Sequence, residues 1–216
     1  MLVLSKKVLY AIENTSYEGA HIVGKKGIGK TVYALIVAWE VFCNLGYDEN
    51  EAWRMALDRL LFSKKEIINY LMAHSGKPDA IVIFDDIRVF MSGMSYHDNP
   101  KETQLLLGLL DTVRTSVSAV ITTSPTLIGV LGFIKKDEDY LIRIVKANAV
   151  RQRRATGYAR YTLPSGTPRV RKTFIDDYAC RLPDKVYREA YKKRMTYKNT
   201  IVKKLKEKAD EYVRTK

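Results

Sequence analysis

The stretch that most constrains the fold of this chain is residues 20–46, where a short apolar run leads into a glycine-rich turn and then into a long apolar segment. The turn, Gly24 to Thr31, matches G-x-x-x-x-G-K-[ST]. Glycines let the backbone curl so that successive N–H groups point inward at phosphate oxygens, and a helix N-terminus adds to the attraction. The motif has this meaning when a strand precedes it and a helix follows it. The sequence therefore predicts a phosphate-binding loop between a strand at 20–24 and a helix at 30–44.

Two side chains of this loop have expected chemical roles. Lys30 is expected to reach the β- and γ-phosphates of a nucleotide, and the Thr31 hydroxyl to ligate magnesium. ATP and Mg²⁺ are therefore the expected cofactors. The predicted nucleotide-binding residues are Gly24, Lys25, Lys26, Gly27, Ile28, Gly29, Lys30, Thr31 and Val32.

A second predicted strand, at residues 80–85, ends in two carboxylates. Its apolar residues, Ile81 to Phe84, are continuous, which suits a strand buried on both faces of a parallel sheet. Carboxylates at the C-terminal end of such a strand lie where α/β sheets bind their ligands. Asp85 is the candidate magnesium ligand, and Asp86 is the candidate to orient or deprotonate the attacking water.

A third strand is predicted at 118–123, after a helix at 101–117, and it ends in the hydroxyl side chains of Thr122, Thr123 and Ser124. These hydroxyls are expected beside the two strands of the magnesium site, where one of them would sense the γ-phosphate or its water. Thr123 is the first candidate because it is nearest the end of the apolar run; a simple strand-end turn is the alternative. The predicted catalytic residues are thus Lys30, Asp86 and Thr123.

The other predicted elements also alternate between helix and strand. Helices are expected at 3–13, 48–62 and 63–76, the last two opened by an acidic or a serine start. This alternation predicts an α/β fold with a largely parallel sheet flanked by helices. The expected divisions are an ATPase core at 1–142, a basic β-hairpin extension packed on the core at 143–183, and a basic C-terminal helix or tail at 184–216.

Charge is divided unevenly along the chain, whose formal net charge is +13. Residues 1–142 carry 15 basic and 17 acidic residues, residues 143–172 carry nine basic and no acidic ones, and residues 184–216 carry 12 basic and five acidic ones. Segregated positive charge predicts a polyanionic partner. Nucleic acid is favoured over a membrane surface because proline and glycine interrupt the basic region.

The basic segment is expected to form strands around the turn-rich LPSGTP and the basic RQRRATG. Arginine binds phosphate bidentately, and Tyr158 and Tyr161 are placed to stack on unpaired bases. In the alternative, these arginines pair with acids of a neighbouring subunit or act across an interface as finger or nucleotide-sensing residues. The predicted nucleic-acid contacts are Arg151, Arg153, Arg154, Arg160, Arg169, Arg171 and Lys172.

Several patterns bear on the compartment. Cys43 and Cys180 form neither a disulfide framework nor a metal spacing, which suits a reducing intracellular environment. We expect no signal peptide, and no apolar run reaches the roughly 18 residues needed to cross a bilayer. A cytoplasmic protein without a membrane partner is therefore expected.

Together, the Gly24–Thr31 loop, IVIFDDIRVF and SAVITTSPT resemble the ASCE branch of P-loop ATPases, especially AAA+ proteins similar to DnaA-type replication initiators. A tighter resemblance, over about residues 20 to 195, is to the DnaA-like ATPases of archaeal spindle-shaped viruses and related plasmids. It includes ENEAWRMALDRLLF and DDYACRLPDKVYREAYKKR. The resemblance implies Mg²⁺-dependent ATP hydrolysis, a homo-oligomer, replication or packaging partners, and the cytoplasm of an archaeal host.

The chain departs from the DnaA-type pattern in two ways. We expect no separate C-terminal helix-turn-helix domain, and no arginine finger follows the third strand closely. Arg114, Arg143 and Arg151 are the candidate fingers.

The combined prediction is a DNA-linked ATPase, either a replication initiator or a helicase loader. A DNA-packaging or translocating motor is the neighbouring alternative. A P-loop small-molecule kinase is less favoured because no arginine-rich lid surrounds an acceptor pocket. The remaining alternative is a binding protein for which the nucleotide is only a switch.

Overall fold

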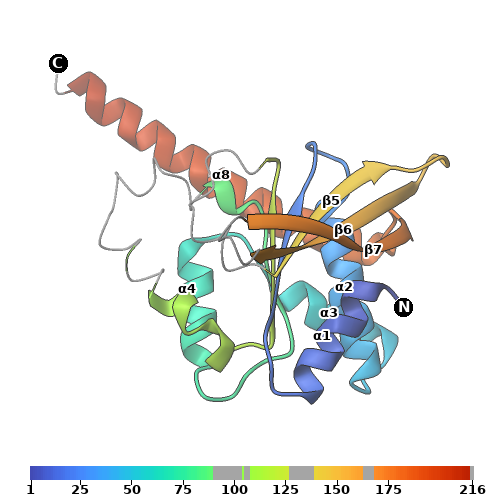
Figure 1. The fold of residues 1–216 in the computed structure, drawn as a ribbon. Coiled ribbons are helices and arrows are strands. Elements are labelled where there is room, and N and C mark those ends of the chain that lie inside the picture. The colour runs from blue at the N-terminus through green and yellow to red at the C-terminus, as the bar shows by residue number, and fades with distance from the viewer. Residues whose placement is uncertain (90–103, 105–107, 127–138, 163–167, 215–216) are drawn as a thin grey trace. The chain divides into compact units, whose positions relative to one another are not determined.

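The computed structural model describes residues 1–89, 104, 108–126, 139–162 and 168–214. They form two compact units, Met1–Leu182 and Pro183–Lys216. The helices of the first unit are α1 (Val3–Glu13), α2 (Lys30–Asn44), α3 (Glu49–Asp58) and α4 (Lys64–Ala73), with 3₁₀ turns at Ile87–Val89 and Val113–Thr115 (Figure 1). Its strands are β1 (Glu18–Val23), β2 (Leu60–Leu61), β3 (Val82–Phe84), β4 (Ala119–Ser124), β5 (Tyr140–Lys146), β6 (Gln152–Thr162) and β7 (Pro168–Ala179).

All seven strands form one sheet in the order β2-β3-β4-β1-β5-β6-β7. The first five strands in this order, β2-β3-β4-β1-β5, pair in parallel. Strands β6 and β7 form a hairpin that continues the sheet with antiparallel pairs. The predicted α/β fold with a largely parallel sheet and a basic hairpin is confirmed. Because β4 lies between β1 and β3, the strand that ends in hydroxyls separates the phosphate-loop strand from the strand that Asp85 follows.

Helices cover both faces of the parallel strands. Val82, Phe84 and Val120 pack with Ile67 and Leu71 of α4 in one buried cluster. Helix α2 packs against α1 and α3, and Figure 1 shows these three helices across the sheet from α4. Burial on both faces explains why β3 is continuously apolar, and why every residue of β4, including its three hydroxyl residues, is buried.

Three predicted boundaries change. The helix predicted at 48–62 ends at Asp58 because Leu60 and Leu61 pair with β3 as an edge strand. Within the helix predicted at 101–117, residues 104 and 108–111 are helical and Val113–Thr115 is a 3₁₀ turn, while 101–103 and 105–107 lie outside the described residues. Most of RQRRATG lies within β6 rather than in a turn.

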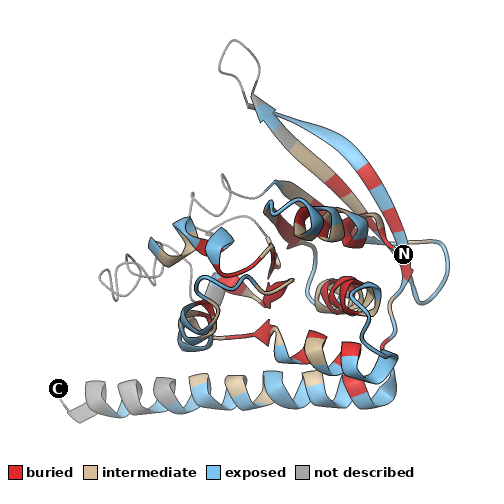
Figure 2. Cartoon of the chain, turned by 90° about the horizontal axis from the view of Figure 1, so that it is seen from below, coloured by how far each residue is buried: buried red, intermediate tan, exposed pale blue. Residues whose placement is uncertain are grey.

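The hairpin has two halves with different surroundings. Its proximal half, residues 152–157 and 174–179, contributes Ala155, Gly157, Phe174, Asp176 and Tyr178 to the interior. Its distal half, residues 158–162 and 168–173, extends away from the helices, and all the described side chains of 169–173 are exposed (Figure 2). The LPSGTP turn falls almost wholly outside the described residues.

The second unit consists of α8 (Asp184–Arg214), the helix predicted for the basic tail. Tyr187 and Tyr191, one turn apart on this helix, are exposed, and their rings stack with centroids 6.2 Å apart. Among the described residues, no helix combines the length and apolarity needed to cross a membrane.

Candidate nucleotide site

The glycine-rich loop connects the end of β1 to the start of α2, as predicted. Gly27 and Gly29 have φ values of 75° and 105°, in the region that favours glycine. At Gly24, a Cβ atom would lie 3.0 Å from Ile28 Cγ2 and 3.1 Å from the Ile144 carbonyl oxygen. The loop therefore needs its glycines for two separate reasons, namely backbone conformation and close packing against β5.

Lys30 folds back over this loop. Its Nζ donates to the carbonyl oxygens of Gly24, at 2.9 Å, and Lys25, at 3.3 Å. Lys25 and Lys26 are exposed, whereas Ile28 is buried and Val32 is half-buried in the first turn of α2. The ammonium group thus lies over the loop that is expected to surround the phosphates.

Asp85 is where the predicted magnesium ligands meet. The hydroxyls of Thr31 and Thr123 both donate to Asp85 Oδ1, at 2.7 and 2.9 Å. The Asp85 side chain lies in the interior, and its backbone N–H donates to the Leu61 carbonyl oxygen of β2 at 2.9 Å. Carboxylate and hydroxyl oxygens are hard ligands of the kind that Mg²⁺ takes beside phosphate oxygens and water, so this donor set fits the cation.

Asp86 follows in an unusual backbone conformation. Its φ is 51°, in the left-handed region that a non-glycine residue adopts only at a cost. The Asp86 N–H donates to Thr123 Oγ1 at 2.9 Å. The Thr123 hydroxyl therefore accepts from the Asp86 N–H and donates to the Asp85 carboxylate, so it links the Asp85 side chain to the Asp86 backbone.

The other hydroxyls at the end of β4 lie elsewhere. Because successive side chains of a strand point to opposite faces, Thr122 and Ser124 are separated from Thr123. The buried His21 ring contacts both of them, with Nδ1 2.6 Å from Thr122 Oγ1 and Nε2 2.8 Å from Ser124 Oγ. Of the three predicted hydroxyls, it is that of Thr123 that donates to Asp85.

The hairpin also reaches the phosphate loop, which sequence reasoning missed. Arg153 Nε donates to the Ile28 carbonyl oxygen at 3.0 Å, and the Tyr178 hydroxyl donates to the Gly29 carbonyl oxygen at 3.1 Å. A Cβ atom on Gly29 would collide with Cys180 Sγ. No local motif marks these residues, although the segment that contains Tyr178 belongs to the late stretch on which the viral resemblance rests.

The other predicted nucleic-acid residues have varied surroundings. Arg154 forms a two-pronged ion pair with Asp177, at 2.8 and 2.9 Å, and both side chains are exposed. The side chain of Arg160 lies outside the description. The remaining exposed members of the set, together with the candidate fingers, are Arg114, Arg143, Arg151, Arg169, Arg171 and Lys172.

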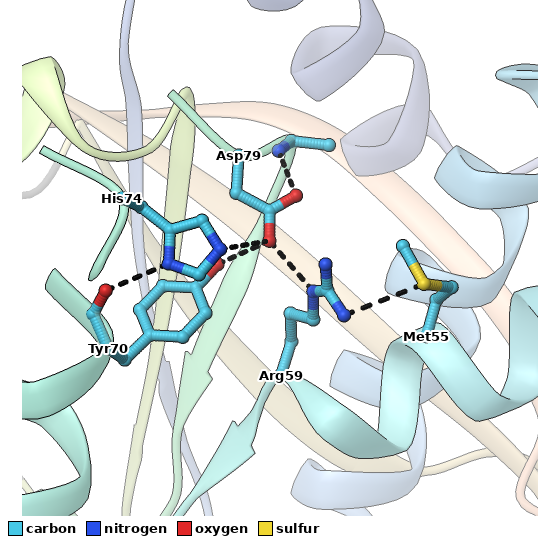
Figure 3. Close-up of polar contacts among 6 residues, drawn as sticks. Met55, Arg59, Tyr70, His74 and Asp79 are labelled. Carbon is cyan, nitrogen blue, oxygen red and sulfur yellow. Dashed lines mark hydrogen bonds and ion pairs between the residues drawn. The ribbon is translucent and has the colours of Figure 1, made fainter. Parts of the chain in front are cut away.

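A second polar cluster lies at the opposite end of β3 from Asp85. Figure 3 shows the Asp79 carboxylate accepting from Arg59 Nε at 2.7 Å and from the Tyr70 hydroxyl at 2.6 Å, with His74 beside it. Burial opposes ionisation of Asp79, but the hydrogen bonds from Tyr70 and Arg59 and the charge of Arg59 lower its pKa. This cluster joins the end of α3, helix α4 and the segment before β3, so it serves as an anchor for the edge of the sheet.

The most informative relatives are viral. The chain is 30% identical over 218 residues to an uncharacterized protein, B-251, of Sulfolobus spindle-shape virus 1, covering 96% of this chain and 85% of the relative. It is 29% identical over 150 residues to the uncharacterized protein ORF286 of Acidianus two-tailed virus, covering 67% of this chain and 49% of the relative. No known family model matches. The expected resemblance to proteins of spindle-shaped viruses is confirmed, and the likeness to DnaA stays a prediction.

Three solved structures have a similar arrangement of helices and strands. They are the flagellar accessory protein FlaH of Methanocaldococcus jannaschii (14% identity, TM-score 0.41, 67% of this chain and 78% of that one), the N-terminal domain of zonular occludens toxin from Neisseria meningitidis (16%, 0.45, 80% and 97%), and a KaiC-like protein of Pyrococcus horikoshii (14%, 0.40, 74% and 88%). At these identities the likeness concerns the fold alone.

Proposed function

The chain belongs to the family of protein B-251 of Sulfolobus spindle-shape virus 1, and we propose that it is a Mg²⁺-dependent ATPase that acts on DNA. The observation that carries this proposal is the convergence of Thr31, Asp85 and Thr123 beside a glycine-rich loop, at the C-terminal edge of neighbouring parallel strands. The favoured role is that of a DnaA-like replication initiator or helicase loader of an archaeal virus or plasmid, acting in the host cytoplasm.

Each residue of the site has a role in this proposal. The loop N–H groups and the N-terminus of α2 bind the phosphates, and Lys30 moves from its loop carbonyls to the phosphate oxygens. Thr31 and Asp85 would hold Mg²⁺, which would supply positive charge beside the phosphate oxygens. Asp86 orients the attacking water or accepts its proton. Thr123 acts through the two acids rather than on the nucleotide, since its hydroxyl hydrogen is donated to Asp85.

The distal half of the hairpin supports the DNA contact. Tyr161 pairs across the strands with Arg169, and Tyr158 pairs with Lys172. Basic residues beside aromatic rings suit single-stranded nucleic acid, because the charges follow the phosphates and the rings stack on bases. Arg169 and Arg171 are two positions apart on β7, so they share one face of it.

The test is ATP turnover by the purified chain, with and without single- and double-stranded DNA, at low and moderate salt. Lys30→Ala is the control that removes the phosphate-binding ammonium. We expect Mg²⁺-dependent turnover, stimulated by DNA, weakened by salt because phosphate contacts release counterions, and lost in the variant. Turnover that ignores DNA would overturn the DNA half of the proposal while leaving the ATPase half.

Two further results would redirect the proposal. Transfer of phosphate to a nucleoside or nucleotide, unaffected by DNA, would indicate a small-molecule kinase. Tight ATP binding with negligible turnover, even with DNA present, would indicate a nucleotide-switched binding protein. A DNA-stimulated enzyme should then be tested for displacement of a bound third strand, which a translocating motor accomplishes and an initiator does not.

A further inference from the structure

The feature that goes beyond the motif is the contact between the proximal half of the hairpin and the backbone of the phosphate loop. Arg153 on β6 reaches the Ile28 carbonyl oxygen, and Tyr178 on β7 reaches the Gly29 carbonyl oxygen, at 3.0 and 3.1 Å. The donors are 125 and 149 residues away from their acceptors along the chain. Two consecutive peptide groups of the loop are thus held from the hairpin side, and the Gly29 carbonyl oxygen also accepts the Tyr33 N–H of α2 at 3.0 Å.

These two carbonyls control the orientation of two N–H groups. A trans peptide is planar, so the C=O of one residue and the N–H of the next point in opposite directions. Turning the Ile28 carbonyl toward Arg153 therefore points the Gly29 N–H away from the hairpin. Tyr178, together with the Tyr33 N–H, fixes the Gly29 carbonyl and so the opposite direction of the Lys30 N–H. A phosphate-binding loop works by pointing N–H groups of this kind at the anion.

Both donors are themselves held in place. The Arg153 guanidinium also donates through Nη1 to the carbonyl oxygens of Gln152, at 2.8 Å, and Val150, at 3.2 Å. The Tyr178 side chain is buried and packs on the Tyr33 ring of α2, with centroids 5.0 Å apart. Burial raises the pKa of the Tyr178 hydroxyl well above its usual range, so the group keeps the proton that it donates.

The packing leaves little room for the loop to turn otherwise. Gly29 has a left-handed φ of 105° and begins α2 without a side-chain cap. Cys180 Sγ lies where a Gly29 side chain would begin. The peptide groups around Gly29 are therefore confined between the hairpin and the site of the anion.

We propose that Arg153 and Tyr178 are positioning residues of the nucleotide site, which hold the Ile28 and Gly29 carbonyls so that the following N–H groups point at the phosphates. This inference rests on the nucleotide binding proposed above. It makes Arg153 and Tyr178 part of the phosphate site, although neither side chain need touch the nucleotide.

The test is the dissociation constant for ATP with Mg²⁺, measured by calorimetry without DNA. Arg153→Met removes a charged donor to a backbone carbonyl and should weaken ATP binding about tenfold. Tyr178→Phe removes one neutral hydrogen bond and should weaken it about threefold. The matched controls Arg54→Met and Tyr10→Phe make the same chemical changes at exposed positions of α3 and α1 and should leave the constant unchanged.

A third variant distinguishes positioning of the loop carbonyls from a general contribution to the packing of the hairpin. Phe174→Leu lies in the same half of the hairpin and loosens its packing without touching the loop carbonyls. It should lower the melting temperature of the nucleotide-free protein without changing the ATP dissociation constant. If Phe174→Leu weakens ATP binding as much as Arg153→Met does, the effect is general loosening and the inference is wrong.

The remaining outcomes distinguish this inference from the proposed function. If the unmodified chain binds ATP, Lys30→Ala does not, and both Arg153→Met and Tyr178→Phe bind like the unmodified chain, the inference fails and the ATPase proposal stands. If the unmodified chain does not bind ATP, both fail. Should Arg153→Met not fold, Tyr178→Phe, which deletes a single oxygen atom, decides the matter.

Discussion

The two halves of the β6–β7 hairpin carry similar basic residues yet have different surroundings. In the proximal half, Arg153 binds a loop carbonyl and Arg154 pairs with Asp177. In the distal half, Arg169, Arg171 and Lys172 are exposed. The difference arises because one face of the proximal half packs on the core, whereas the distal half extends beyond it. A run of basic residues therefore does not define one surface, since Arg153 contacts the glycine-rich loop and Arg154 is occupied by an ion pair.

Asp176 provides the largest expected effect in the proximal half. This buried carboxylate accepts from the Val3 and Leu4 N–H groups, at 2.7 and 3.3 Å, and from the Tyr33 hydroxyl at 2.6 Å. Asp176→Ala leaves three donors without an acceptor and should lower the free energy of unfolding by about 3 kcal/mol, measured by denaturant titration. Asp177→Ala, one residue along, removes only an exposed ion pair and should cause no measurable change. Equal losses would mean that the inward and outward faces do not differ as described.

Substitutions in the distal half should change the affinity for DNA rather than the stability of the fold. Replacing Arg169, Arg171 and Lys172 together by alanine removes three exposed charges. If each contacts a phosphate, the slope of log affinity against log salt should become shallower by about three, since each contact contributes roughly one. Fluorescence anisotropy with labelled DNA measures the slope, and ATP turnover without DNA is the control that should stay constant. An unchanged slope would place the DNA contact elsewhere on the chain.

The junction between the two halves is tested at Gly157, where the register of β6 and β7 shifts. A Cβ atom at this position would overlap the Phe174 ring. Gly157→Ala should therefore lower the free energy of unfolding by about 2 kcal/mol through overpacking. Adding Phe174→Leu to this variant should recover part of the loss, whereas Val170→Ala in the exposed distal half should be neutral. A lack of recovery would show that the cost comes from the backbone rather than from the ring.

The smallest expected effect is a dependence of stability on pH, which arises at Glu18. The stability measurements on the hairpin variants should therefore all be made at one pH. Burial, and then the charge of Asp139, raise the pKa of Glu18 to about 7, with Lys7 opposing. Because the folded chain holds this proton more tightly than the unfolded chain does, Glu18 contributes most to stability below its usual pKa of 4.5 and progressively less as the pH rises to about 7. Between pH 4.5 and 8, the melting temperature should therefore decrease less steeply with pH for Glu18→Gln than for the unmodified chain. If melting temperature depends on pH in the same way for both chains, Glu18 has the same pKa in the folded and unfolded chain.

Much of the site follows from the sequence by itself. The strand, glycine-rich loop and helix that present Lys30 and Thr31 depend on spacing within one continuous segment, and so does the apolar strand that ends in Asp85. Because parallel strands bring their C-terminal ends to one edge of the sheet, local patterns were enough to predict that Asp85 and Thr123 would meet near Thr31.

Tertiary structure decided what those patterns do not encode. The pleat of β4 separated Thr123 from Thr122 and Ser124, and pairing with β3 turned the end of a predicted helix into a strand. The partners of Arg153 and Tyr178 lie 125 and 149 residues away. Contacts over such separations depend on strand order and register, so the residue types at either end do not reveal them. Charge patterning alone predicts that Arg153 meets a polyanion, and only the folded chain shows it bound to the loop expected to hold the phosphates.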